Sequence, residues 1–194
     1  MIRFFDIIFS LVGLVLLFPV FILIALMIVL DSKGNVFFIQ TRVGKNNADF
    51  RLYKFRTMHP ATEGSGSLTV GEADKRITWT GRFLRKYKLD ELAQLFNVLK
   101  GEMSFVGPRP EVRKYVDLYS DEQKKVLAVR PGITDFASIE FINENEILGK
   151  TSDPEQTYIA EVMPEKIRIN MKYINNPGIR NYFIIIGKTL RHII

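Results

Sequence analysis

The chain has 194 residues, of which 47% are hydrophobic, and its 27 lysines and arginines outnumber its 21 aspartates and glutamates, giving a net charge of +6. This length suits one compact domain with appendages. The absence of cysteine excludes disulfides, thiolate nucleophiles and cysteine-ligated metals, and two histidines are too few for an ordinary zinc site. Any catalysis must therefore use carboxylates, lysines, arginines, hydroxyls or a bound cation.

The N-terminal region carries an uninterrupted apolar run. Residues 7–30 contain no charge, and as one helix they would measure roughly 36 Å against a hydrocarbon core of about 30 Å. A buried core helix normally keeps a polar face. A cleaved signal peptide would need more basic residues than Arg3 and a small-x-small site before Asp31. The run is therefore predicted to be a membrane segment, with the basic remainder on the anionic cytoplasmic face.

A proline lies close to the middle of this run. Pro19 removes a backbone hydrogen bond and disfavours helical geometry at Phe18, so a kink is expected there. From the residues alone, a kinked single span and a re-entrant hairpin are equal alternatives. The flanking charges lack a strong bias and favour the hairpin slightly.

Residues 36–58 alternate short apolar stretches with turn residues, which is typical of a β-hairpin. In the second strand Lys54 and Arg56 share a face, because side chains alternate along a strand. Two cations on one strand face could hold a phosphate. The alternative is that this face is simply exposed to solvent. The small residues 60–71 that follow are expected to form a loop.

Two adjacent carboxylates, Asp90 and Glu91, follow the cationic run 85–88 and open a segment with a helical apolar stripe that ends before Gly101. Anions at a helix start lie near partial positive charge, and nearby cations could bind a phosphorylated ligand there. The alternative is an ordinary helix start, with Asp90 as N-cap and Glu91 as a first-turn acid.

The segment 102–111 cannot continue this helix, because a glycine and two prolines interrupt it. Such a rigid loop could aim Arg109 with little entropic loss, and a solvent-facing corner is the alternative. Beyond residue 164, apolar and aromatic residues mixed with cations predict amphipathic helices. These helices suit either a bilayer surface or ordinary core packing.

Taken in order, several short motifs resemble a family, the bacterial sugar transferases, also called monotopic phosphoglycosyl transferases. The similar blocks span residues 4 to about 134, and their order and spacing carry the resemblance. They are Phe4-Phe5-Asp6 before the proline-broken apolar run, Val36-Phe37-Phe38-Ile39-Gln40 with Arg42-Val43-Gly44, Tyr53-Lys54-Phe55-Arg56-Thr57-Met58, Leu89-Asp90-Glu91-Leu92, Phe105-Val106-Gly107-Pro108-Arg109-Pro110-Glu111, and Arg130-Pro131-Gly132-Ile133-Thr134.

The resemblance implies a reaction in which an Asp-Glu dyad transfers a sugar phosphate from a UDP-sugar to a polyprenyl (undecaprenyl) phosphate, releasing UMP. Asp90 is then the expected nucleophile, forming a covalent aspartyl-phosphosugar. Glu91 is expected to assist as a base or by helping to hold Mg²⁺, for which Asp90 is the expected ligand. Lys54, Arg85 and Arg109 correspond to the family's phosphate-gripping cations. A carboxylate is a reasonable phosphoryl acceptor, and Mg²⁺ and bases would offset the charge of the diphosphate.

The resemblance also implies a mainly helical α+β fold. Residues 1–32 are expected to form a re-entrant membrane anchor, and residues 33–194 a catalytic domain with membrane-surface helices on the cytoplasmic face of the bacterial inner membrane. The expected partners are the two substrates and the lipid bilayer, without nucleic acid, and a homodimer is left open. The chain would be a minimal form of the family. It departs from many relatives at Phe18, where they have serine, and from Asp135 onward, where they continue with Gly-Leu.

A noncatalytic reading competes with the enzyme. A membrane-anchored basic module could bind anionic lipid or nucleic acid through its cationic face, and its binding would weaken steeply with salt. Such a module would not require two adjacent carboxylates between basic residues.

Overall fold

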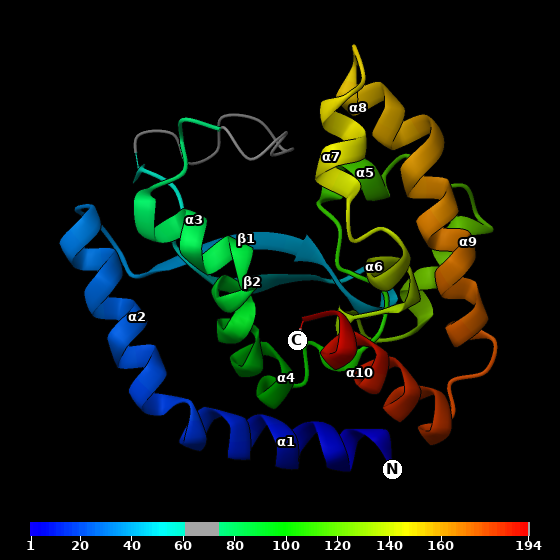
Figure 1. The fold of residues 1–194 in the computed structure, drawn as a ribbon. Coiled ribbons are helices and arrows are strands. Elements are labelled where there is room, and N and C mark those ends of the chain that lie inside the picture. The colour runs from blue at the N-terminus through cyan, green and yellow to red at the C-terminus, as the bar shows by residue number, and fades with distance from the viewer. Residues whose placement is uncertain (61–73, 194) are drawn as a thin grey trace.

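The computed structural model describes residues 1–60 and 74–193, and the predicted loop 60–71 lies almost wholly outside them. The described part is mainly helical and contains two small two-stranded sheets, which confirms the α+β class. In Figure 1 the first two helices run along the bottom and left of the molecule, the strands lie in the middle, and helices from the C-terminal third cover the right.

Helices α1 (Ile2–Leu16) and α2 (Phe18–Asp31) meet at Leu17 at an angle of 61°. Pro19 lies in the first turn of α2, where its missing N–H has no helical acceptor to lose. Neither helix alone is long and apolar enough for a membrane span, nor is any other helix of the described residues, but this bent pair meets the length and composition of one. The expected kink is therefore confirmed.

The pair is tied to the rest of the molecule near both ends. Near the start of α1, Asp6 is buried and its Oδ1 accepts hydrogen bonds from Ser104 Oγ at 2.9 Å and Tyr182 Oη at 3.0 Å. At the end of α2, a carboxylate oxygen of Asp31 accepts from the backbone N–H of Thr80 at 2.8 Å. Between these ties the pair leaves large apolar side chains exposed, at Ile7, Ile8, Phe9, Leu11, Val12, Val15, Leu16, Phe18, Ile22, Leu23, Leu26, Val29 and Leu30.

Strands β1 (Phe37–Val43) and β2 (Asp49–Phe55) pair antiparallel around the short 3₁₀ turn η1 (Lys45–Asn47), so the predicted hairpin is confirmed. The idea that Lys54 and Arg56 act together on one phosphate is wrong. Arg56 is 2% exposed and donates to the carbonyls of Ser32 and Lys33 at 2.7 and 2.6 Å, so it closes the C-terminal end of α2 instead.

The carboxylate pair lies in a 3₁₀ helix, η3 (Leu89–Gln94), between α3 (Trp79–Lys86) and α4 (Leu95–Lys100). The N-cap position belongs to Lys88, which adopts the left-handed conformation with φ 55°, so the interpretation of Asp90 as an N-cap is wrong. Gly101 ends α4 with φ 90°, as the sequence predicts, because glycine adopts this conformation without a Cβ clash.

Two three-residue strands, β3 (Ser104–Val106) and β4 (Gly132–Thr134), pair in parallel across the middle of the molecule. Five short elements fill the segments between and after these strands. They are α5 (Arg113–Val116), η4 (Gln123–Ala128), α6 (Phe136–Glu140), α7 (Glu144–Gly149) and α8 (Pro154–Thr157). A π-helical turn, η5 (Tyr158–Val162), then runs into α9 (Met163–Ile174), and α10 (Ile179–Ile193) follows.

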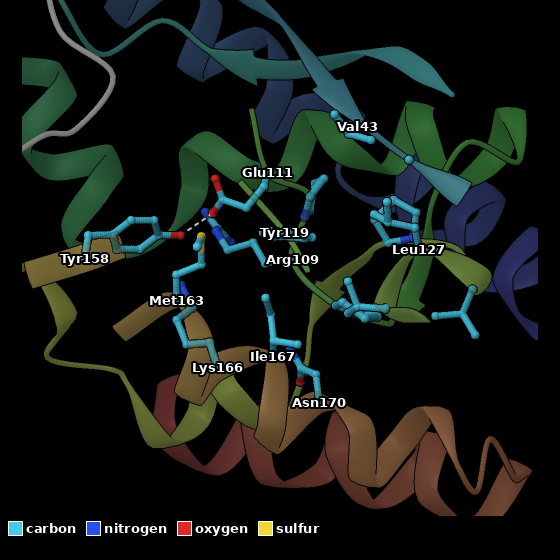
Figure 2. A pocket seen from close by; sticks show the side chains of 16 residues that line it. Val43, Arg109, Glu111, Tyr119, Leu127, Tyr158, Met163, Lys166, Ile167 and Asn170 are labelled. Atoms are coloured by element: carbon cyan, nitrogen blue, oxygen red, sulfur yellow. Dashed lines mark hydrogen bonds between the residues drawn. The ribbon is translucent and has the colours of Figure 1, made fainter. Parts of the chain in front are cut away.

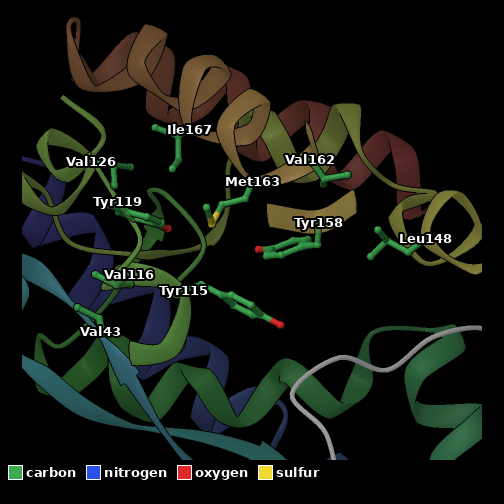
Figure 3. Packing of buried hydrophobic residues seen from close by; sticks show 10 residues of the cluster. All are labelled: Val43, Tyr115, Val116, Tyr119, Val126, Leu148, Tyr158, Val162, Met163 and Ile167. Carbon is green, nitrogen blue, oxygen red and sulfur yellow. The ribbon is translucent and has the colours of Figure 1, made fainter. Parts of the chain in front are cut away.

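Apolar side chains from this half form a core cluster between α9 and the end of β1. Figure 3 shows Tyr115, Tyr119, Tyr158, Met163 and Ile167 converging in it. Core packing therefore accounts for the apolar face of α9.

Helix α10 packs on α1 and buries Tyr182 and Ile185, while Phe183, Ile184 and Leu190 stay exposed. The ring of Phe183 contacts those of Phe5 and Phe9, so Phe183 extends the apolar surface of the N-terminal pair.

Candidate active site

The site is built around the carboxylate of Glu91, which receives two cations from distant parts of the chain. Lys54 of β2 donates to Oε1 of Glu91 at 3.0 Å. Arg109, which lies in the loop after β3, contacts both oxygens of Glu91, and the distance from its Nη1 to Oε2 is 3.2 Å. Glu91 itself is held by the 3₁₀ turn η3, which packs against β2. The geometry is the bidentate guanidinium–carboxylate pairing that fixes both partners in direction.

These contacts determine the ionisation of the cluster. Burial alone would raise the pKa of Glu91, but the guanidinium of Arg109 and the ammonium of Lys54 hold it well below its usual range. Burial lowers the pKa of Lys54, with Glu91 acting against that effect. The attraction of Glu91 raises the pKa of Arg109. Glu91 is therefore an anionic anchor for two cations at neutral pH.

Asp90 lies next to this anchor in a different environment. Its side chain is 7% exposed, and among the described residues its carboxylate accepts no hydrogen bond. Burial raises the pKa of Asp90, the charge of Lys54 opposes this, and the negative charge of Glu91 adds to it. The dyad thus divides into one paired carboxylate and one carboxylate with open oxygens.

Arg85 reaches the same region from α3. Its Nε donates to Thr57 Oγ1 at 2.9 Å, and the burial that lowers its pKa is partly offset by the charge of Asp90. The structure therefore brings together all five residues that the sequence singles out, namely Lys54, Arg85, Asp90, Glu91 and Arg109.

The loop that carries Arg109 is fixed by residues that the sequence did not identify. The backbone N–H of Arg109 donates to Asp135 Oδ2 at 2.7 Å, and the same oxygen accepts from Asn170 Nδ2 at 3.0 Å. On the other side of the loop, Arg42 donates to the carbonyl of Pro110 at 3.1 Å. Arg42 stands in the Arg-Val-Gly block of the sequence, which was the only available signal. Asp135 coincides with a departure from the family pattern.

A cavity of about 40 Å³ lies next to the site, behind the loop that carries Arg109. Figure 2 shows that it lies between this loop and α9, with Tyr119, Met163 and Lys166 around it. Glu111 accepts a hydrogen bond from Tyr158 Oη at 2.5 Å on its wall, drawn as a dashed line. Arg109 also lines a smaller space beside Lys54 and Gln94, so this one side chain borders both.

A metal ion would have few protein ligands here. No group of three or more His, Cys, Asp or Glu side chains comes together within residues 1–60 and 74–193. Because both oxygens of Glu91 are engaged by cations, Asp90 is the carboxylate of the dyad with free coordination capacity. This donor set fits a Mg²⁺ ion, which is usually held by one or two carboxylates and the phosphates of a substrate.

The chain is similar to a known protein family along its whole length. The family model described as "Bacterial sugar transferase" matches residues 1–194. The chain is 38% identical, over 97% of its length, to the UDP-N-acetylgalactosamine-undecaprenyl-phosphate N-acetylgalactosaminephosphotransferase of Aeromonas hydrophila, covering 42% of that protein. It is 37% identical, over 80% of its length, to the UDP-glucose:undecaprenyl-phosphate glucose-1-phosphate transferase of Caulobacter vibrioides, covering 55% of it.

A third relative is the undecaprenyl-phosphate glucose phosphotransferase of Komagataeibacter xylinus, 42% identical over 71% of this chain and covering 27% of that protein. The chain thus spans about half or less of the length of these three relatives. With a match along its whole length and the motif residues gathered in one site, the chain belongs to the bacterial sugar transferase family.

Proposed function

We propose that the chain is a phosphoglycosyl transferase that moves a sugar-1-phosphate from a UDP-sugar to undecaprenyl phosphate. One observation carries this proposal: the two adjacent carboxylates have different surroundings, with Glu91 neutralised by Arg109 and Lys54 while Asp90 keeps open oxygens. The names of the three relatives, which all state undecaprenyl phosphate, support the acceptor, and two of them state a UDP-sugar.

In the first step, a carboxylate oxygen of Asp90 attacks the phosphorus atom that bears the sugar. A bond forms between this oxygen and phosphorus, and the bond from phosphorus to the bridging oxygen of the diphosphate breaks. The electron pair of the broken bond leaves with UMP. Carboxylates serve as covalent phosphoryl acceptors in other enzymes. Lys54, Arg85 and Arg109 offset the negative charge of the diphosphate as Asp90 approaches it.

In the second step, an oxygen of the polyprenyl phosphate attacks the same phosphorus. The bond to Asp90 breaks, its carboxylate is regenerated, and the product is a polyprenyl diphosphosugar. An acceptor phosphate is largely ionised at neutral pH and needs little help from a base. The depressed pKa of Glu91 therefore favours a role in positioning Arg109 and Lys54 over a role as general base.

A Mg²⁺ ion bound by Asp90 and the substrate phosphates would supply further charge neutralisation. Asp90 would then serve both as nucleophile and as metal ligand, because both oxygens of Glu91 already contact Arg109 and Lys54.

We further propose that residues 1–32 form a re-entrant anchor and that residues 33–194 lie on the cytoplasmic face of the bacterial inner membrane. Both ends of the α1–α2 pair contact the same globular part, through Asp6 at one end and Asp31 at the other. A helix pair that crossed the bilayer would carry these ends to opposite faces and break one set of contacts. The 61° bend and the exposed apolar side chains between the ends support the same placement.

The function is tested with Asp90→Asn, which keeps the size of the side chain and removes its nucleophilic charge. Purified protein in detergent is incubated with Mg²⁺, undecaprenyl phosphate and four donors, UDP-GlcNAc, UDP-GalNAc, UDP-glucose and UDP-galactose. We expect UMP release from at least one donor, a drop on the order of 10³-fold or more in the variant, and a phosphosugar adduct by intact mass only in the unaltered chain.

Asp117→Asn is the matched control, because the Asp117 side chain is 63% exposed, follows the last residue of α5 and makes no contact with Asp90 or Glu91 among the described residues. Full UMP release by Asp90→Asn would refute the assignment of the nucleophile. Salt-sensitive binding to anionic vesicles without UMP release from any donor would favour the noncatalytic basic module instead.

A further inference from the structure

The cavity behind the Arg109 loop adjoins the proposed site of phosphoryl transfer. Arg109 contacts Glu91 with its guanidinium and lines the cavity as well. A donor whose sugar-bearing phosphate contacts Arg109 would therefore have this cavity within reach of its sugar. The cavity volume of about 40 Å³ is that of roughly three water molecules, which is smaller than a whole hexose.

The cavity is lined by both apolar and polar side chains. Val126, Leu127, Met163 and Ile167 give it apolar walls. Among them stands Tyr119, whose side chain is 7% exposed and whose hydroxyl makes no hydrogen bond to any described residue. Figure 3 shows the hydroxyl end of Tyr119 on the side of Met163.

Charged groups complete the wall. Burial raises the pKa of the Tyr119 hydroxyl, and the negative charge of Glu111, which also lines the cavity, raises it further. The ammonium of Lys166 is paired with Glu144 Oε2 at 2.7 Å and retains further donor capacity. The cavity thus offers an apolar surface, an unpaired hydroxyl donor and a carboxylate acceptor within a space of a few atoms.

We propose that this cavity binds the acetamido group of a 2-acetamido sugar on the donor, an inference that rests on the transferase function proposed above. An acetamido group has four heavy atoms, which suits the volume. Its methyl group would contact the walls of Met163 and Ile167, its carbonyl would accept from Tyr119, and its N–H would donate to Glu111. A 2-hydroxyl in its place has one heavy atom against four, so it would leave most of the space unfilled and would lack the carbonyl that accepts from Tyr119.

The test compares kcat/KM for UMP release from UDP-GlcNAc, UDP-GalNAc, UDP-glucose and UDP-galactose. We expect the unaltered chain to prefer an acetamido donor over its plain hexose counterpart by about 10-fold or more. Tyr119→Phe removes the donor without changing the packing, and it should reduce kcat/KM about 5-fold for the acetamido donors alone. Val126→Phe, which fills the cavity, should abolish the preference.

Tyr173→Phe is the matched control, since Tyr173 is a buried tyrosine of α9 that does not line the cavity. It should leave the donor preference unchanged. Equal kcat/KM for acetamido and plain donors in an active enzyme, or an equal loss on all donors in Tyr119→Phe, would overturn the acetamido pocket and leave the transferase function standing. No UMP release from any donor by the unaltered chain would overturn the function itself, and the pocket with it.

Discussion

Asp90 and Glu91 are adjacent in the chain, yet their pKa values move in opposite directions. The cause is the distribution of cations, because Arg109 and Lys54 contact Glu91 directly. The ionisation of Asp90 is disfavoured by burial and by the negative charge of Glu91. One carboxylate thus fixes the cations, and the other keeps the reactivity that desolvation gives an anion with free oxygens.

Replacing Glu91 by glutamine tests this division. The substitution removes a negative charge beside Asp90 and releases Arg109 and Lys54 to interact with it, so both effects lower the pKa of Asp90. In the proposed mechanism Asp90 must be ionised to attack, so UMP release is expected to rise with pH through the pKa of Asp90, which lies above the ordinary value of 3.8. We expect the acid limb of the single-turnover pH–rate profile to shift to lower pH in Glu91→Gln, together with a lower maximal rate.

Glu161→Gln, at an exposed position of η5, is the control and should leave the limb in place. A shift of the Glu91→Gln limb to higher pH would contradict the repulsion between the two carboxylates.

The sequence predicts the dyad and its three cations through motif order, but it does not predict how they are positioned. Arg42 meets Pro110 across 68 residues, and Arg109 meets Asp135 across 26. Such contacts leave no local pattern in the chain. The N-cap interpretation of Asp90 failed for a related reason: a left-handed lysine, which local propensity does not favour, begins the turn instead.

At the scale of elements, the parallel pair β3–β4 is the frame that carries the Arg109 loop on one strand end and Asp135 on the other. The two strands approach closely at Gly107 and Gly132. A Cβ on Gly132 would lie 2.1 Å from the backbone nitrogen of Gly107, a distance that no side chain accepts without movement of the backbone. The close approach therefore requires glycine at this position.

Gly132→Ala should force the strands apart and displace Arg109 from Glu91. We expect a loss of roughly 1–3 kcal/mol in the free energy of unfolding, as for overpacked sites, and a fall in kcat beyond the folded fraction. Urea unfolding and steady-state kinetics measure the two effects. Gly149→Ala is the matched control, because its Cβ would meet no atom within 4 Å, and it should change stability by no more than about 0.5 kcal/mol.

The elements differ in how far the sequence predicts them. The hairpin β1–β2 follows from period-two alternation and a turn, both local signals. Strands β3 and β4 have three residues each and pair across an intervening stretch of 25 residues, so no periodicity reveals them. The sequence also leaves open whether α9 and α10 pack on the protein core or on a bilayer. An amphipathic pattern shows which face of a helix is apolar, but not whether protein or lipid covers that face.

At the scale of the whole molecule, the α1–α2 pair runs along two sides of the remaining body (Figure 1), and it exposes a series of large apolar side chains. Hydrogen bonds between the pair and that body lie near the two ends of the pair, at Asp6 and Asp31. Under the proposed membrane placement, a helix pair held in this way keeps the proposed active site at a fixed height relative to the apolar surface of the pair. Such a fixed height suits an acceptor whose phosphate lies at the membrane interface.

The absence of cysteine makes the proposed topology directly testable. Single cysteines are placed before Met1, at Leu16 near the bend, and at Lys33, and are labelled with a membrane-impermeant maleimide on inverted inner-membrane vesicles. We expect labelling before Met1 and at Lys33 from the cytoplasmic face and protection at Leu16. Labelling of the two end positions from opposite faces would show a kinked single span instead.

The bond between Asp6 and Tyr182 also has a consequence for the order of events during synthesis. The two residues are 176 positions apart, so at about 5–20 residues per second roughly 9–35 seconds separate their appearance. During part of that interval Ser104 and the backbone N–H of Phe105 can already donate to Asp6, but the donor on α10 is missing. The hydrogen bond from Tyr182 is therefore the last of the three to Asp6 that can form, which makes docking of α10 on α1 a late event in the maturation of this protein.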